Sequence, residues 1–121
     1  MQKRVLTVDD SKTMRDMLLV TLKQAGYDVI QADDGQAGLS KLEAEGADVI
    51  ITDINMPVMD GIAFIKACRA QPAYASTPIL TLTTESSDAR KAEGRAAGAT
   101  GWIVKPFNPE RLVRVIEKVC P

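Results

Sequence analysis

Hydrophobic and polar positions along the chain form two alternating patterns. Short apolar runs rich in β-branched residues have the length and composition of buried strands. Between these runs, apolar residues recur every three or four positions, which is typical of amphipathic helices. The pattern predicts strands at residues 4–8, 27–32, 48–52, 79–83 and 101–104. It predicts helices at residues 12–25, 35–44, 61–69, 87–97 and from residue 109 onward.

Polar residues and glycines mark the ends of the predicted helices. Ser11, Asp60 and Asn108 each stand directly before a helical run, where their side chains can cap it. Gly26 and Gly98 follow helical runs, where a left-handed residue is favoured. Strand and helix alternate throughout, which favours a parallel sheet covered by helices on both faces and joined by right-handed crossovers.

The predicted fold class is therefore α/β. We expect a doubly wound five-stranded parallel sheet of order 2-1-3-4-5 with five helices, flavodoxin-like in its arrangement. Residues 1–121 are expected to form a single domain with no output domain. In the first helix, the apolar stripe containing Met17 and Leu18 is expected to face the sheet, and in the last helix the stripe containing Leu112 and Ile116.

Composition and charge exclude several classes of function. The 121 residues include two cysteines and no histidine, so Ser-His-Asp catalysis and histidine zinc sites are excluded. The net charge is −1, with 15 basic and 16 acidic residues interspersed, which gives no footprint for nucleic acid. No apolar run is long enough to span a membrane. We expect a monomeric, cytoplasmic protein with free thiols.

Chemically capable residues leave four of the predicted strands. Asp9 and Asp10 follow the first strand, Asp53 follows the third, Thr83 ends the fourth and Lys105 follows the fifth. The carboxyl ends of parallel strands meet at one edge of a sheet, so these residues are expected to converge there. Carboxylate oxygens without histidine or cysteine select a hard cation, most plausibly Mg²⁺. Three carboxylates, a divalent ion and one ammonium balance formally, which suits a phosphoryl group.

Each of these residues also has a simpler explanation. A lone aspartate after a strand is most often a turn former or helix cap. Asp33 and Asp34, before Gly35, are assigned to a turn for this reason. Agreement among four strand ends favours a site for the remaining acids and the lysine. No glycine-rich nucleotide loop is present, so phosphate is expected from a partner protein or a small donor, with Asp53 as the nucleophile.

Four motifs at these positions resemble a known family. They are VDDSKTMR at 8–15, DINMPVMDG at 53–61, TLTTE at 81–85 and GWIVKPF at 101–107. Together they resemble a response-regulator receiver domain. The chain is most similar to stand-alone chemotaxis regulators of the CheY type.

The resemblance implies a phosphoacceptor and a metal site. Asp53 would accept a phosphoryl group from the phosphohistidine of a sensor kinase. Asp10, the Asp53 carboxylate and the backbone carbonyl of Asn55 would bind Mg²⁺, with Asp9 acting through water. Asn55 and Glu85 stand at positions that tune how fast water removes the phosphate.

The resemblance also implies a switch. Lys105 would bind a phosphoryl oxygen, and its peptide bond to Pro106 would be cis. Thr83 would turn its hydroxyl towards the phosphate, and Trp102 would follow. Trp102 stands where the family usually has Tyr, Phe or His, and its size is expected to limit that movement. Thr84 stands where a smaller residue is common, and its bulk is expected to restrict access to the site.

The implied function is a phosphorylation-controlled signalling switch of a two-component chemotaxis pathway. The protein would catalyse only its own phosphorylation and dephosphorylation, and would otherwise not be an enzyme. The expected partners are a chemotaxis histidine kinase and either the flagellar motor switch protein or a phosphatase. The expected output face combines the helix at 87–97, the strand at 101–104 and the last helix, and presents Arg90, Lys91, Arg95, Trp102, Phe107, Arg111 and Arg114. Two alternatives stay open: a phosphate sink without motor output, and a Mg²⁺-dependent phosphohydrolase.

Overall fold

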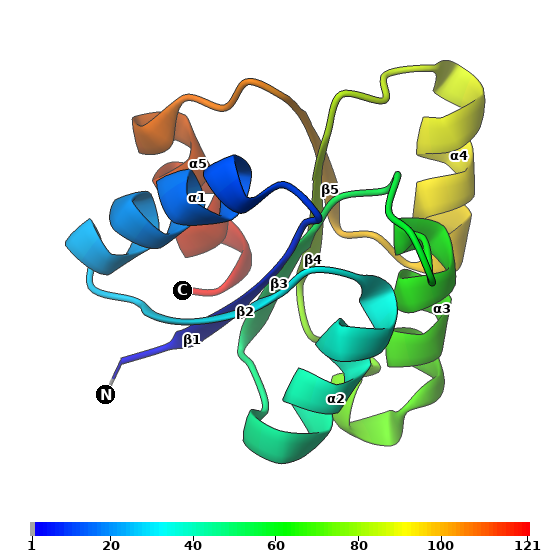
Figure 1. Cartoon of the computed structure of the whole chain (residues 1–121), viewed down its shortest axis with the longest axis horizontal. Helices are drawn as coiled ribbons and strands as arrows, with labels where there is room; N and C mark the ends of the chain where they lie inside the picture. Colours follow the sequence, from blue (N-terminus) through cyan, green and yellow to red (C-terminus); the bar gives the residue numbers. More distant parts are fainter. Residues whose placement is uncertain (1) are drawn as a thin grey trace.

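The computed structural model describes residues 2–121 as five strands alternating with five α-helices and one short 3-10 helix (Figure 1). The elements are β1 (Arg4–Val8), α1 (Lys12–Gln24), β2 (Asp28–Ala32), α2 (Gly35–Glu45), β3 (Val49–Thr52), α3 (Gly61–Ala70), η1 (Pro72–Tyr74), β4 (Ile79–Thr83), α4 (Asp88–Ala97), β5 (Gly101–Val104) and α5 (Pro109–Val119). The predicted alternation is confirmed, and element ends differ from the predicted ones by a residue or so. No helix within residues 2–121 is long and apolar enough to cross a membrane.

The five strands form one parallel sheet of order β2-β1-β3-β4-β5, as the sequence predicts. β3 is therefore the central strand, and β1 and β4 flank it. In the register of β1 and β3, Val8 lies opposite Thr52. The next residues, Asp9 and Asp53, therefore leave neighbouring strands at the same level, and the N–H of Asp53 donates to the carbonyl of Val8 at 2.9 Å.

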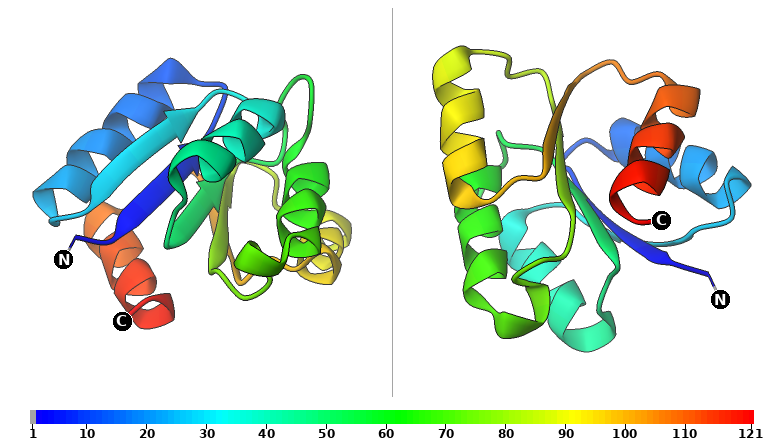
Figure 2. Two further views of the ribbon diagram at one scale, coloured as in Figure 1. Left: turned by 90° about the horizontal axis from the view of Figure 1, so that it is seen from below. Right: turned by 180° about the vertical axis from the view of Figure 1, so that it is seen from behind.

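Helices cover both faces of the sheet (Figures 1 and 2). α1 and α5 lie on one face, and α2, α3 and α4 lie on the other. Successive strand residues point to opposite faces, so each strand feeds both halves of the core. Val5 and Ile51 pack with α1 and α5, whereas Leu6 and Ile50 pack with the other three helices. Asp53 follows Ile51 by two positions, which places its side chain towards the α1 and α5 face.

The helix ends follow the predicted capping pattern. Ser11, Asp60 and Asn108 each accept a hydrogen bond from the backbone N–H three residues ahead. Asp34 caps α2 in the same way, because its Oδ1 accepts from the N–H of Ala37 at 2.7 Å. The acid pair after β2 therefore forms a turn and a cap, in agreement with its assignment from sequence.

Two predicted burial positions are wrong. Met17 is 46% exposed, because α1 contacts the sheet mainly through Leu18 and Leu22, and Met17 lies beside that narrow stripe. Phe107, expected on the output face, is only 9% exposed and packs with Leu112 in the core under α5. The aromatic part of that face is therefore Trp102 alone among the residues expected there.

Candidate functional site

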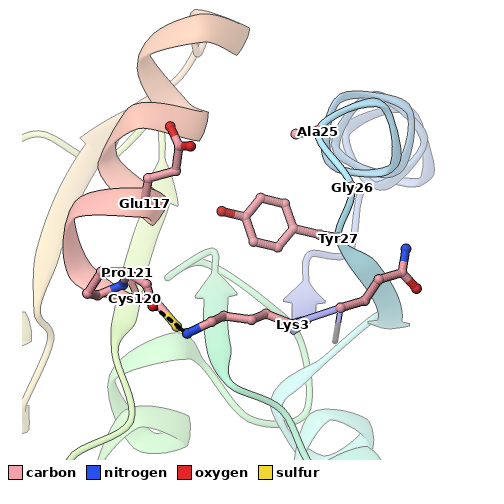
Figure 3. Close-up of a pocket in the computed structure, with 8 residues that line it drawn as sticks. Lys3, Ala25, Gly26, Tyr27, Glu117, Cys120 and Pro121 are labelled. Carbon is pink, nitrogen blue, oxygen red and sulfur yellow. Dashed lines mark hydrogen bonds between the residues drawn. The ribbon is translucent and has the colours of Figure 1, made fainter.

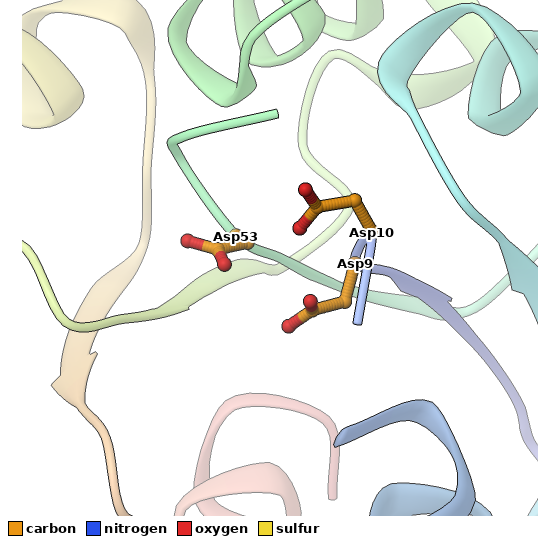
Figure 4. A group of neighbouring side chains, drawn as sticks. All are labelled: Asp9, Asp10 and Asp53. Atoms are coloured by element: carbon orange, nitrogen blue, oxygen red, sulfur yellow. The ribbon is translucent and has the colours of Figure 1, made fainter. Parts of the chain in front are cut away.

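Three aspartates meet at the carboxyl edge of the central strands (Figure 4). Asp9 and Asp10 follow β1 and Asp53 follows β3, and one carboxylate oxygen from each lies within 4.8 Å of the others. Asp9 is 2% exposed and Asp53 is 7% exposed, whereas Asp10 faces solvent. The cluster is thus buried on one side and open on the other, where a ligand can enter.

Lys105 joins two of these acids. Its Nζ lies 2.8 Å from Oδ2 of Asp9 and 2.8 Å from Oδ2 of Asp53, with its side chain only 13% exposed. Its backbone N–H donates to the carbonyl of Thr83 at 2.8 Å, and its peptide bond to Pro106 is cis. These constraints hold the ammonium at the sheet edge, between the ends of β1 and β3.

Burial and ion pairing act in opposite directions on these groups. Burial raises the pKa of Asp9, and this outweighs the lowering by hydrogen bonds from Lys105 and the Ser11 N–H. Burial alone would lower the pKa of Lys105, but its hydrogen bonds to Asp53 and Asp9 raise the pKa above the usual value. We conclude that the ion pair with Lys105 does not fully offset the cost of burying the charged Asp9 carboxylate.

The backbone around Asp53 is tightly fixed. Its Oδ1 accepts a hydrogen bond from the N–H of Ile54 at 2.6 Å, and Ile54 is fully buried. Gly61, the first residue of α3, packs against this segment and donates its N–H to the carbonyl of Ile54 at 2.8 Å. A Cβ at Gly61 would collide with the carbonyl oxygen of Asp53. Gly61 therefore allows α3 to start directly against the phosphoacceptor candidate.

Thr83 and Trp102 lie on the other face of the sheet, with α3 and α4. Thr83 is fully buried, and its hydroxyl accepts from the N–H of Glu85 at 3.2 Å. The indole N–H of Trp102 donates to the carbonyl of the same Glu85 at 2.9 Å. Its ring lies against Gly94 of α4, where a Cβ would come within 2.5 Å of the ring. Gly94 thus makes room for the tryptophan, and Glu85 connects the threonine to it.

Several expected site residues lie at the surface around the cluster. Asn55 and Thr84 are exposed, and Glu85 is half-buried with its carboxylate accepting from the Ser87 hydroxyl at 2.9 Å.

Val58, in the loop between β3 and α3, is 83% exposed and has a φ of 68°. A β-branched residue rarely adopts this left-handed conformation, so the loop beside the site is strained.

Two residues that shape the site, Arg15 and Gly61, were not expected from the sequence. Arg15 of α1 reaches back and donates to the carbonyl of Asp9 at 2.6 Å. Gly61 gives the clearance against Asp53 described above. Both residues end motifs that the sequence analysis had recognised, at 8–15 and 53–61, but neither had been given a role.

A cavity of about 490 Å³ opens at the opposite edge of the sheet from the aspartate cluster (Figure 3). Lys3, Tyr27, Glu117 and Cys120 line it, and the Lys3 ammonium lies 3.5 Å from the Cys120 sulfur. Lys3 also donates to the carbonyl of Pro121 at 2.6 Å. These residues lie at the amino ends of β1 and β2, so this cavity is separate from the aspartate cluster.

The fold and the cluster together define a flavodoxin-like α/β domain with a lysine-bridged acidic cluster at the carboxyl edge of its sheet. Residues 5–117 match the family model described as the response regulator receiver domain. The chain belongs to this family. Membership implies phosphorylation-controlled signalling through a domain that acts as a switch, and receiver domains typically bind Mg²⁺ in an acidic pocket.

Relatives of known name agree with this assignment. The chain is 41% identical over 118 residues to the chemotaxis protein CheY1 of Helicobacter pylori strain J99, covering 96% of this chain and 95% of that protein. It is similar to the structure of the chemotaxis response regulator CheY4 of Vibrio cholerae, with 53% identity, a TM-score of 0.93 and coverage of 98% and 99% of the two chains. A putative response regulator from Chloroflexus aurantiacus superimposes with a TM-score of 0.94 at 33% identity, over 99% of this chain and 98% of that one.

Proposed function

We propose that this protein is a phosphorylation-controlled switch of a chemotaxis pathway, in which Asp53 accepts a phosphoryl group from the phosphohistidine of a sensor kinase. One observation carries the proposal. The Asp53 carboxylate stands at the end of the central strand with Oδ2 at 2.8 Å from the Lys105 ammonium and two further carboxylates beside it. Two of the three relatives described above are named as chemotaxis proteins, which supports the choice of pathway.

The transfer forms one bond and breaks one. A carboxylate oxygen of Asp53 attacks the phosphorus, the P–N bond to the donor imidazole breaks, and an aspartyl phosphate results. The N–H of Ile54 holds Oδ1, which fixes the rotation of the carboxylate. Lys105, already 2.8 Å from Oδ2, moves its hydrogen bond to a phosphoryl oxygen and stabilises the charge that is transferred to the site.

The donor set fits Mg²⁺. All three clustered side chains offer oxygen, and a hard divalent cation prefers oxygen ligands. Three carboxylates share the site with one ammonium, so the cluster carries a net negative charge that a divalent cation would neutralise. We assign Asp10, Asp53 and the backbone carbonyl of Asn55 as direct ligands, with Asp9 acting through water. When bound, the ion supplies positive charge that neutralises the phosphoryl oxygens.

In the proposed switch, the backbone of Glu85 connects Thr83 to Trp102. Turning the Thr83 hydroxyl towards a phosphoryl oxygen gives up the hydrogen bond from the N–H of Glu85, and the carbonyl of Glu85 holds Trp102. The loop and the indole therefore respond together. A coupling free energy of about 1–3 kcal/mol would change partner affinity roughly 5- to 150-fold. Asn55 and Glu85 border the entrance, where they would tune attack by water on the phosphate.

The surface of α4, β5 and α5 is the output face in this proposal. Arg95 and Arg111 are exposed there and line pockets together with the half-buried Trp102, whereas Arg114, expected on the same face, lies on the side of α5 that faces α1. A basic face with one aromatic side chain fits an acidic or amphipathic segment of a partner. We propose the kinase, the flagellar motor switch protein or a phosphatase as that partner, and a monomeric switch in the cytoplasm.

Phosphorylation by a small phosphodonor tests the nucleophile. We expect Mg²⁺-dependent, base-labile incorporation into the unchanged protein and none into Asp53→Asn. The matched control is Asp33→Asn, an aspartate that also follows a strand but lies in the turn after β2, and it should incorporate phosphate normally. Equal incorporation into Asp53→Asn would refute the assignment, and continuous turnover of a phosphate ester that this variant abolishes would favour the phosphohydrolase.

A further inference from the structure

Arg15 is a half-buried residue of α1, and its side chain connects this helix to the loop that carries Asp9 and Asp10. Its backbone N–H donates to the carbonyl of Ser11 at 3.0 Å, as expected in the first turn of α1. Its side chain then turns back, and Nη1 donates to the carbonyl of Asp9 at 2.6 Å. Within residues 2–121, the guanidinium makes no ion pair with a carboxylate. This charge is therefore directed at a backbone carbonyl rather than at an acid.

The carbonyl that Arg15 holds belongs to the peptide unit between Asp9 and Asp10. The other groups of Asp9 are fixed independently. Its N–H donates to the carbonyl of Ala32 at 3.1 Å, and its carboxylate accepts from the Ser11 N–H and from Lys105. Asp10 is exposed and has no such support. The orientation of the Asp10 side chain therefore depends on this peptide plane, which Arg15 fixes.

Arg15 is itself supported from the sheet. The side-chain amide of Gln31, on β2, donates to the carbonyl of Arg15 at 3.1 Å. The edge strand thus fixes the first turn of α1, and that turn fixes the peptide between the two acids. The bond from the Arg15 guanidinium to the Asp9 carbonyl, at 2.6 Å, is charge-assisted, and such bonds hold geometry more firmly than neutral ones.

We propose that Arg15 is a positioning residue for the divalent cation, which sets the Asp9–Asp10 peptide so that the Asp10 carboxylate faces Asp53. This inference rests on the proposed Mg²⁺ site. Groups that orient metal ligands from the second layer typically contribute 10- to 100-fold to metal affinity. Because Asp10 keeps its own side chain in any Arg15 variant, we expect the lower end, about tenfold.

Charge and positioning predict opposite results when Arg15 is replaced. Removing a cation close to an acidic cluster strengthens the attraction for Mg²⁺ if only charge matters. Losing the hydrogen bond to the Asp9 carbonyl weakens Mg²⁺ binding if positioning matters. The sign of the change in affinity therefore separates the two explanations without any measurement of phosphorylation.

Isothermal titration calorimetry with Mg²⁺ alone tests the proposal. We expect Arg15→Met to raise the Kd about tenfold, and Arg15→Lys, which keeps a charged donor, to return it towards the original value. The matched control is Lys12→Met, which removes a cation from the same turn. Lys12 pairs with Asp16 at 2.8 Å, whereas Arg15 donates to the Asp9 carbonyl, so the Kd of the Lys12→Met variant should stay unchanged or fall.

The outcomes are distinguishable. An unchanged or lower Kd in Arg15→Met, with normal Mg²⁺ binding by the original protein, overturns the positioning role and leaves the metal site intact. Absence of Mg²⁺ binding by the original protein overturns both this inference and the proposed metal site. Urea unfolding without Mg²⁺ checks that each variant is folded, and Arg15→Gln replaces Arg15→Met if the latter does not fold.

Discussion

Replacing Lys105 with methionine tests how strongly the acidic cluster depends on its one ammonium. The substitution keeps the length of the side-chain stem and removes the charge. Lys105 is 13% exposed at its side chain, and its partners Asp9 and Asp53 are 2% and 9% exposed. Removing one member of a buried ion pair costs about 3–5 kcal/mol, because the remaining charge is left uncompensated. Asp9 already has a raised pKa and can take up a proton, so we expect a loss of about 3 kcal/mol near neutral pH.

The loss should depend on pH in a defined direction. Without the ammonium, the buried Asp9 carboxylate loses a contact that lowers its pKa and is harder to ionise in the folded state, and this penalty disappears as Asp9 is protonated at acidic pH. The pKa of Lys105 is raised in the folded protein, so its stabilisation is complete below the unfolded value of 10.5 and is lost as the pH rises through the folded value. The difference between the two proteins should therefore be largest near neutral pH and smaller at both extremes.

Urea unfolding followed by circular dichroism measures this difference. Lys12→Met is the control, because Lys12 and Asp16 also lie 2.8 Å apart but are 79% and 55% exposed. Exposed pairs contribute about 0–1 kcal/mol, so the control should change the free energy of unfolding by less than about 0.5 kcal/mol. Equal losses in both variants, or a loss in Lys105→Met that does not vary with pH, would refute the reasoning.

Three further predictions concern stability. Ile116→Ala, at a fully buried position of α5, should lower the free energy of unfolding by about 2–5 kcal/mol in urea melts. The control Val20→Ala, at a 57% exposed position, should change it by less than about 0.5 kcal/mol. An equally small effect of Ile116→Ala would show that α5 is not docked on the sheet. Val58→Asn should raise the free energy of unfolding by about 1 kcal/mol, because asparagine tolerates the φ of 68° better than valine. An unchanged free energy of unfolding would argue against strain in that loop. Asp9→Asn should raise stability at neutral pH without divalent ions, because burial raises the pKa of Asp9. That gain should shrink as the pH falls through the folded pKa towards the ordinary value of 3.8, and a gain that persists there would contradict the cause.

The fold could be predicted from sequence because it depends on local patterns. The apolar runs, the capping residues and the strict alternation of strands and helices each act within a few residues. The position of the acidic cluster could also be predicted from the sequence, because parallel strands bring their carboxyl ends to one edge of the sheet. Asp9, Asp53 and Lys105 converge for this reason alone.

The remaining features depend on contacts between segments that are distant in the sequence. The clearance between Gly61 and the Asp53 carbonyl and the fit of Trp102 against Gly94 arise only when the helices pack on the sheet. Gly94 accommodates the Trp102 ring in this conformation, and the expectation that the size of Trp102 limits its movement stays a prediction. Met17 was misplaced because helical periodicity defines a stripe but not its width, which packing determines.

The most direct test of the central claim is to locate the modified residue. The protein is incubated with a small phosphodonor and Mg²⁺, the aspartyl phosphate is reduced with borohydride to homoserine, and the digested chain is sequenced by mass spectrometry. The account predicts homoserine at position 53 and at no other aspartate. Homoserine at Asp9, Asp10 or any other aspartate, with position 53 unchanged, would contradict it.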